Sequence, residues 1–209
     1  MNKTIVTDLH FLPSLEYFSL LISSESIILE ANENYIKQSY RNRCYILGAN
    51  KIEPLIIPVQ KDKSKMPIRD VKIDYSEQWI KIYWRTVEAA YKKAPFFEYY
   101  ADYFKDILDK KPIFLWDLNF ELLSICLKFL KVSLPISLTE KYEKNYVDGI
   151  IDCRNLISPK IDFKINEFYR PVSYTQNFGN DFVANLSILD LLFCKGNMSK
   201  EILAKSFKK

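Results

Sequence analysis

Residues 4–30 constrain the fold of this chain most strongly, because they have the pattern of a strand, a helix and a second strand. Residues 4–7 form a short apolar run that predicts a buried strand. Pro13 and Ser14 then open an apolar helical stretch, and residues 26–30 predict the next strand. This spacing suits a crossover between parallel strands. We therefore expect an α/β fold with a short, mostly parallel or mixed sheet and packed amphipathic helices.

The middle of the chain, residues 76–131, predicts a series of amphipathic helices. Apolar side chains recur with helical spacing over residues 79–90 and again over 96–110, and Asn119 is expected to cap a third helix. No Gly/Ser-rich linker divides the sequence. We therefore expect a single domain over residues 1–209, with the helical segment inserted in it.

Shorter patterns predict the remaining elements. These are a hairpin of residues 44–47 and 55–59, strands at 71–73, 149–152 and 161–165, and a loop at 135–146. Asn185 is expected to cap a last helix that ends at Gly196, because Gly favours the left-handed conformation common after helix ends. A solvated, lysine-rich tail is expected after this helix.

Scarce residue types exclude several classes of enzyme. The chain has a single histidine, His10, and four glycines, so it has no multi-histidine metal site and no glycine-rich phosphate loop. We expect neither a metal nor a cofactor. His10 follows the first predicted strand, where open α/β sheets place ligand chemistry, but it has no neighbouring cysteine or serine motif that would pair with it.

Charge and cysteine content bear on partners and location. The net charge is +4 and the basic residues are dispersed, which does not favour nucleic acid as a partner. The four cysteines form no C-x-x-C pair and are expected to be reduced core residues. No signal-peptide pattern and no transmembrane run of about 20 apolar residues is present. We expect a cytoplasmic protein, either free or peripheral to the inner membrane.

The segment of residues 35–43 concentrates polar side chains that can bind an anion. Its candidate substrate-binding residues are Lys37, Gln38, Arg41, Asn42 and Arg43. Arginine can bind phosphate or carboxylate through paired N–H donors. The alternative is an exposed basic turn that makes weak surface ion pairs.

Asp190 is the unusual residue near the C-terminus, because it lies within an apolar helical run. A buried carboxylate is costly unless it is paired, so Asp190 is a candidate base, together with Gln176. Asn185 and Ser187 are further candidate substrate-binding residues beside it. The alternative is a structural Asp190 that holds the arginines of residues 35–43 or nearby backbone.

Several short strings follow one another in order along nearly the whole chain. They are residues 11–13, 17–18, 35–43, 55–59, 84–86, 90–91, 94–98, 99–100, 152–154, 158–160, 174–176 and 185–193. In order and spacing they resemble the WbqC-like family of bacterial proteins, in a form similar to the branch found in Bacteroidota. His10 and Cys194 depart from residues common in that family, so the resemblance argues against a catalytic role for either.

The resemblance implies a role in polysaccharide and O-antigen biosynthesis, where family members are described as sugar-modifying transferases, some of them acyl or glycine transferases. On this first hypothesis, Lys37, Arg41 and Arg43 bind the anionic group of a nucleotide-sugar or acyl donor. Asp190 and Gln176 orient or deprotonate the acceptor. A second hypothesis is a non-catalytic interaction protein that docks a partner in envelope biogenesis or secretion, and the sequence leaves both open.

Overall fold

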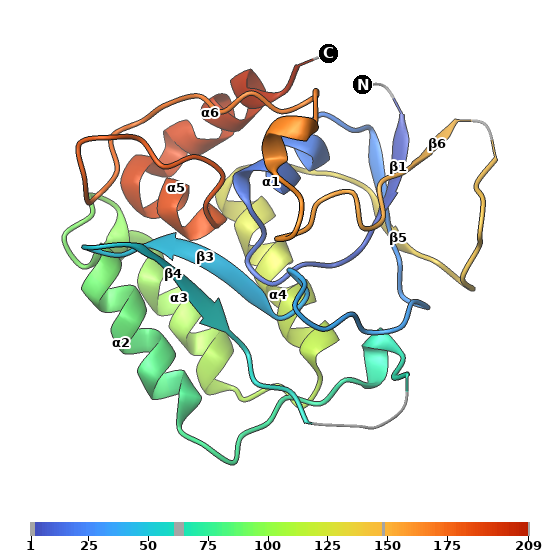
Figure 1. The fold of residues 1–209 in the computed structure, drawn as a ribbon, viewed down its shortest axis with the longest axis horizontal. Helices are drawn as coiled ribbons and strands as arrows, with labels where there is room; N and C mark the ends of the chain where they lie inside the picture. Colours follow the sequence, from blue (N-terminus) through green and yellow to red (C-terminus); the bar gives the residue numbers. More distant parts are fainter. Residues whose placement is uncertain (1–2, 61–64, 148, 209) are drawn as a thin grey trace.

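The computed structural model describes residues 3–60, 65–147 and 149–208 (Figure 1). The strands are β1 (Thr4–Thr7), β2 (Ser26–Leu29), β3 (Arg43–Leu47), β4 (Ile52–Ile56), β5 (Ile136–Leu138) and β6 (Ile150–Asp152). The α-helices are α1 (Leu15–Ile22), α2 (Trp79–Tyr91), α3 (Phe97–Asp109), α4 (Leu115–Phe129), α5 (Ile188–Lys195) and α6 (Ser199–Ser206).

A four-stranded sheet with the order β5-β2-β1-β6 forms the N-terminal part of the fold. All three pairings are parallel, and Ile5 of β1 lies opposite Ile27 of β2 and Ile151 of β6. Ile5 and Ile27 are fully buried, as expected for a parallel sheet whose faces are covered by other elements. The predicted strand, helix and parallel strand are therefore confirmed, and the fold is α/β.

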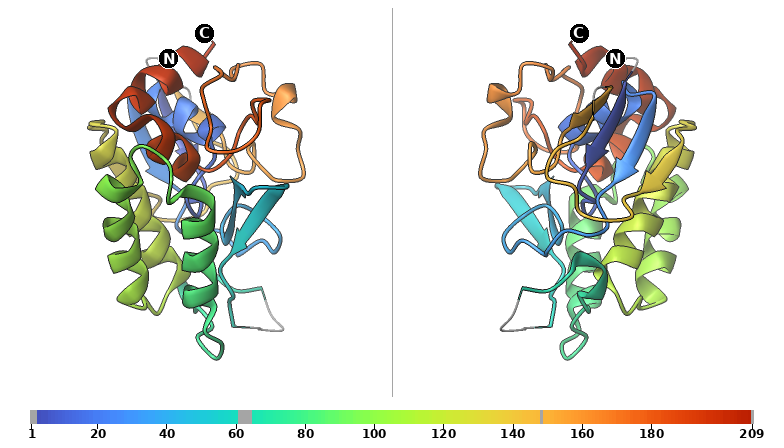
Figure 2. Two further views of the ribbon diagram at one scale, coloured as in Figure 1. Left: turned by 90° about the vertical axis from the view of Figure 1, so that its left-hand side faces the viewer. Right: turned by 90° about the vertical axis from the view of Figure 1, so that its right-hand side faces the viewer.

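The helical segment is also confirmed, as α2, α3 and α4. The side views in Figure 2 show these helices on one side of the molecule and the β3–β4 hairpin on the other. The expectation that Asn119 caps the third helix is wrong. α4 begins at Leu115, and Asn119 lies inside it, where its Nδ2 donates to the Arg41 carbonyl oxygen at 2.7 Å. Asn119 is a residue type common at helix caps, but its hydrogen bond to the buried Arg41 carbonyl oxygen explains its place inside the helix.

The predicted hairpin forms, but its second strand begins three residues earlier than residue 55. β3 and β4 are antiparallel, with Cys44 opposite Leu55 and Tyr45 opposite Pro54. Pro54 is tolerated because, among the described residues, β4 pairs with β3 alone and is an edge strand. Residues 71–73 form only isolated bridges, to Val59 and Phe114.

Three expectations for the second half of the chain are wrong. Residues 136–138 of the predicted loop form the edge strand β5, fixed by backbone pairing to β2. Residues 161–165 contain a short 3₁₀ turn instead of a strand, because the Asp162 carboxylate accepts from the Lys164 N–H. The predicted tail forms α6, whose Leu203 is fully buried and whose helix packs against α1.

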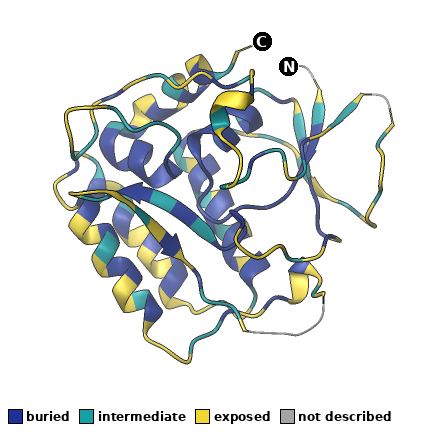
Figure 3. Cartoon of the chain, viewed as in Figure 1, coloured by how far each residue is buried: buried dark blue, intermediate teal, exposed yellow. Residues whose placement is uncertain are grey.

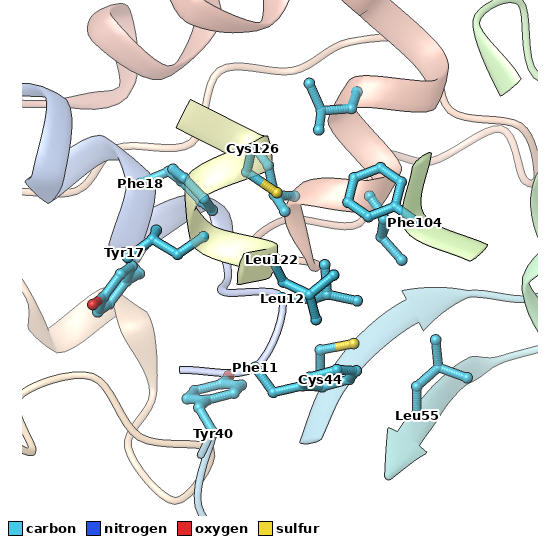
Figure 4. Packing of buried hydrophobic residues seen from close by; sticks show 14 of the residues in the cluster. Phe11, Leu12, Tyr17, Phe18, Tyr40, Cys44, Leu55, Phe104, Leu122 and Cys126 are labelled. Carbon is cyan, nitrogen blue, oxygen red and sulfur yellow. The ribbon is translucent and has the colours of Figure 1, made fainter. Parts of the chain in front are cut away.

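One cluster of buried hydrophobic side chains extends from β1 to α6. Figure 3 shows the buried inner faces and exposed outer faces of α2 and α3, and Figure 4 shows Leu12, Cys44 and Leu122 converging from three segments of the chain. All four cysteines are buried and free, as expected for core residues. Within residues 3–60, 65–147 and 149–208, no helix combines the length and apolar character needed to cross a membrane.

Candidate functional site

Polar side chains gather where the parallel strands end. We call this group the strand-end centre, and its members are Asp8, His10, Glu30, Glu33, Arg41, Asp152 and Arg154. Asp8 directly follows β1, Glu30 directly follows β2, and Asp152 is the last residue of β6. Open α/β sheets bind ligands at this edge, because loops leave the strands there in different directions. The position makes the strand-end centre a candidate functional site.

Asp8 and His10 form a buried pair within the strand-end centre. The His10 Nε2 lies 2.7 Å from the Asp8 Oδ2, and both residues are about 1% exposed. The other ring nitrogen, Nδ1, is buried without a hydrogen-bond partner. The ring lies against Tyr17 and Tyr40, with centroid distances of 4.6 and 5.4 Å. His10 is therefore oriented by a carboxylate, but it is closed off from solvent.

Arg41 neutralises the same group. Its Nε and Nη2 donate to both oxygens of Glu33, at 2.7 and 2.5 Å, and Nη2 lies 3.1 Å from the Asp8 Oδ2. Nη2 also donates to Asn155. Burial alone would lower the pKa of Arg41, but the Glu33 and Asp8 carboxylates raise it, so the guanidinium stays charged. Arg41 is committed to partners within the protein.

Arg154 closes the other side of the strand-end centre. Its guanidinium donates to Glu30 at 2.7 Å and to Asp152 at 2.6 Å. It also lies over the rings of Tyr142 and Tyr146, at 4.6 and 4.9 Å from their centroids. The loop after β5 is thereby held against the strand ends.

Arg43, in contrast, has no acidic partner among the described residues. It is half-buried at the start of β3, and its Nε is buried without a hydrogen-bond partner. Lys37 and Gln38 are exposed nearby in the sequence, whereas Asn42 is buried and donates to the Ile57 carbonyl oxygen at 2.8 Å. Among the described residues, Arg43 is thus the arginine of residues 35–43 that has no acidic partner.

Asp190 lies in a second polar group, which we call the Asp190 centre, with Tyr91, Tyr174 and Gln176. The carboxylate is fully buried and accepts from Tyr174 at 2.6 Å, Gln176 at 2.9 Å and Tyr91 at 3.0 Å. Burial raises its pKa, although the three hydrogen bonds oppose this effect. The structure therefore brings Asp190 and Gln176 together, but tyrosines, and not arginines, hold Asp190.

Asn185 and Ser187 contact the start of α1. The Asn185 Oδ1 accepts from the Glu16 N–H at 2.9 Å, and its Nδ2 donates to the Glu16 carboxylate. Ser187, which caps α5 in place of the expected Asn185, donates to the Leu12 carbonyl oxygen. Both residues join α1 to α5, and neither contacts the strand-end centre in the described part of the chain.

The sequence pattern did not single out the carboxylates of the strand-end centre. Asp8 and Glu30 carried a usable signal, because Asp8 directly follows the strand predicted at residues 4–7 and Glu30 is the last residue of the strand predicted at 26–30. Glu33 carried none, because its pairing with Arg41 depends on how the chain returns after β2. In the described residues, no three His, Cys, Asp or Glu side chains are arranged to hold a metal ion.

Comparisons with known proteins place the chain in a family. A model of the WbqC-like protein family matches residues 9–156 and 148–202. "Uncharacterized protein Rv1507c" of Mycobacterium tuberculosis (strain ATCC 25618 / H37Rv) is 27% identical over 230 residues, which cover 97% of this chain and 98% of that protein. No solved structure matches. The matched ranges contain Arg43 and the Asp190 centre. The chain belongs to the WbqC-like protein family.

Proposed function

We propose that this chain is a transferase that modifies activated sugars or glycoconjugate precursors in surface-polysaccharide biosynthesis, with acyl or glycine transfer among the forms this takes. Its donor binds through an anionic group, such as a diphosphate. Membership of the WbqC-like family supports the substrate class, through the role that this family is described as having. The observation that carries the proposal is that Arg43 has no acidic partner among the described residues.

A half-buried guanidinium without a counter-ion is unfavourable, because burial removes water that would otherwise solvate the charge. Arg41 and Arg154 avoid this cost through ion pairs to carboxylates. Arg43 has no such pair among the described residues. An anionic donor group supplies the missing partner, and the planar guanidinium can donate to it through two N–H groups. Lys37 and Gln38, both exposed, are placed to assist at the same segment.

Arg41 and Asn42 have a different part in this proposal, because their side chains are already bonded within the protein. They hold the segment that presents Arg43. Asp190, which is fully buried, acts on an acceptor through Tyr174 and Gln176 and does not touch the acceptor itself. Asn185 and Ser187 fix α5, and with it Asp190, relative to α1.

We also propose that the reaction takes place in the cytoplasm or at the cytoplasmic face of the inner membrane. The four buried cysteines support this location, because each is a free thiol within the core.

Calorimetric titration with nucleotide-sugars and acyl-CoA thioesters tests the donor site. We expect at least one of these donors to bind, and Arg43→Ala to weaken its binding by about 10-fold or more, as for loss of a charge-assisted hydrogen bond. The melting temperature should change little. Arg69→Ala, at an exposed arginine, is the matched control and should bind as the wild type does.

Arg41→Ala separates binding from folding. Because it leaves Glu33 and Asp8 buried without their cation, we expect it to destabilise the protein by about 3–5 kcal/mol. Equal loss of stability in Arg41→Ala and Arg43→Ala would contradict the donor site and assign both arginines to the framework. Unchanged donor affinity in Arg43→Ala would contradict it as well.

A non-catalytic interaction protein that docks a partner in envelope biogenesis or secretion is the alternative. One observation favours it: α2 and α3 carry large hydrophobic side chains on their outer surfaces, and Ile82, Tyr99 and Tyr103 are 64%, 70% and 51% exposed. A pull-down that recovers a stoichiometric protein partner from the wild type but not from Ile82→Asp or Tyr99→Asp would support this alternative. A nucleotide-sugar that co-purifies with the protein would count against it.

A further inference from the structure

The loop that precedes α5 surrounds a cavity of about 410 Å³ (Figure 1, orange segment). This volume is in the range of small-molecule sites. The cavity is lined by residues from one segment, 173–182. They are Ser173, Tyr174, Thr175, Gln176, Phe178, Gly179, Asn180, Asp181 and Phe182. We call it the loop pocket. None of its residues belongs to the strand-end centre.

Hydrogen bonds to buried and half-buried groups fix the walls of the loop pocket. The Gln176 side chain donates to the Val183 carbonyl oxygen at 2.9 Å and accepts from the Val183 N–H at 2.8 Å, which closes the base of the loop. Asn177 donates to the Ala90 carbonyl oxygen at the end of α2. Asp190 accepts from both Tyr174 and Gln176. Because these walls are held in advance, a ligand would pay little to order them.

The lining combines aromatic rings with uncharged polar groups. Tyr174 and Phe182 pack edge to face, with centroids 5.0 Å apart, and Phe178 also lines the cavity. The side chains of Thr175 and Asn180 are exposed and make no hydrogen bond within the described chain. Hydroxyl and amide groups both donate and accept, which matches the hydroxyl groups of a sugar, while aromatic faces suit its C–H surface.

The charge of its lining indicates that the loop pocket binds a different ligand from the anionic donor. Among the described residues, no lysine, arginine or histidine lines the loop pocket, and its one charged side chain is the Asp181 carboxylate. A phosphate there would meet repulsion and find no cation. The chemistry of the loop pocket therefore excludes the anionic part of a donor and fits an uncharged sugar ring.

We propose that the loop pocket binds an uncharged sugar ring, which is the acceptor of the transfer proposed above, and that Asp190 is a positioning residue for its walls. The assignment as acceptor rests on the proposed function, whereas the binding of a sugar does not. β3 joins the two sites. Arg43 stands at one end of β3, and at the other the Leu47 N–H donates to the Tyr91 hydroxyl, which donates in turn to Asp190. Four residue steps along a strand span about 13 Å.

Saturation-transfer NMR with methyl glycosides of a hexose, a 6-deoxyhexose and a 2-acetamido sugar tests the proposal. We expect at least one glycoside to receive saturation from the protein, and Phe178→Ala and Asn180→Ala each to weaken its binding by about 5-fold or more. Phe120→Ala, at an exposed phenylalanine of α4, is the matched control and should leave binding unchanged. Both pocket substitutions lie on a surface loop, so the fold should be retained.

Two outcomes would contradict sugar binding in the loop pocket. Either no glycoside of the panel binds, or glycoside binding is unchanged in both Phe178→Ala and Asn180→Ala. Arg43→Ala distinguishes this failure from failure of the proposed function. It should keep glycoside binding while losing donor binding. Glycoside binding in a protein that binds no donor would support the loop pocket and contradict the transferase. Asp190→Asn should alter the pH dependence of glycoside affinity, which a residue with only a structural role would not do.

Discussion

Asp8 and Asp190 are both buried carboxylates, but their surroundings shift their proton affinities in opposite directions. Burial would raise the pKa of Asp8, but the charge and hydrogen bond of His10, together with Arg41, outweigh burial and lower it. Asp190 has hydrogen-bond donors but no cation beside it in the described chain, so burial dominates and raises its pKa. The two residues therefore affect stability with opposite dependence on pH.

The sign of each effect follows from proton linkage. An unfolded aspartate has a pKa of about 3.9. The folded pKa of Asp8 is lower, so its contribution to stability is present above about pH 4 and is lost as the pH falls. The folded pKa of Asp190 is higher, so its contribution is present below about pH 4 and is lost as the pH rises. Denaturant titrations between about pH 3 and pH 7, followed by tryptophan fluorescence, measure both effects.

We expect the stability advantage of the wild type over Asp8→Asn to shrink by about 1 kcal/mol as the pH falls through this interval. The stability advantage of the wild type over Asp190→Asn should instead shrink as the pH rises through the same interval. The two variants serve as controls for each other. Differences that change in the same direction would show that one of the carboxylates is not in the environment described.

At the scale of single residues, the sequence could predict that Asp190 needs polar partners, but not that Arg41 is part of an internal ion pair. A carboxylate within an apolar helix is unusual whatever the tertiary structure, so Asp190 and its need for partners were visible. Arg41 and Arg43 look equivalent in the sequence, because each is a cation in the same short segment. Only the return of the chain after β2, which brings Glu33 to Arg41, makes one of them an internal ion pair and leaves the other without an acidic partner among the described residues.

Gly196 ends α5 in a conformation that other residues avoid. Its φ is +53°, and a Cβ at this position would lie 2.5 Å from the Phe96 ring. We expect Gly196→Ala to lower the free energy of unfolding by about 2–4 kcal/mol, from backbone strain and the steric clash together. Gly149 has a φ of +97°, but a Cβ there would meet no neighbouring atom within 4 Å, so Gly149→Ala should cost only about 1–2 kcal/mol.

Phe96→Ala provides a second control for this prediction. In a double-mutant cycle measured by chemical denaturation, Gly196→Ala should cost less in the Phe96→Ala background, because the clashing ring is gone. An unchanged cost in that background would assign the whole effect to the backbone.

Helices and buried strands with clear periodicity were the elements that the sequence could predict. Residues 4–7, 26–29 and the three central helices belong to this class. β5 was missed because three residues in a polar segment carry no usable period, and its register is set by backbone pairing to β2 alone. α6 was missed because its lysines resemble a solvated tail, while burial of Leu203 against the rest of the core is a tertiary effect.

At the scale of the whole molecule, we propose that residues 1–209 fold as one domain, with the helical segment as a part of it. The buried cluster that runs from β1 to α6 supports this proposal, as does the packing of α1 against α6 from opposite ends of the chain. A domain with one core is expected to unfold as a unit.

Equilibrium unfolding should therefore show a single transition. Trp79, Trp84 and Trp116 all lie in α2 or α4, so their fluorescence reports on the helical segment. Hydrogen exchange of peptides from β1 and β2, measured by mass spectrometry at increasing denaturant, reports on the sheet. We expect the two midpoints to coincide, whereas helices that unfold before the sheet would divide the chain into two units.

β3 constrains how sequences of this kind can evolve. Over residues 43–46 its side chains alternate, with Cys44 and Ile46 buried and Arg43 and Tyr45 half-buried on the other face. Point changes on the outer face leave that alternation intact. An insertion or deletion between residues 43 and 47 would reverse it and turn a guanidinium toward the core. We therefore expect drift in the composition of this strand among relatives, but not in its length.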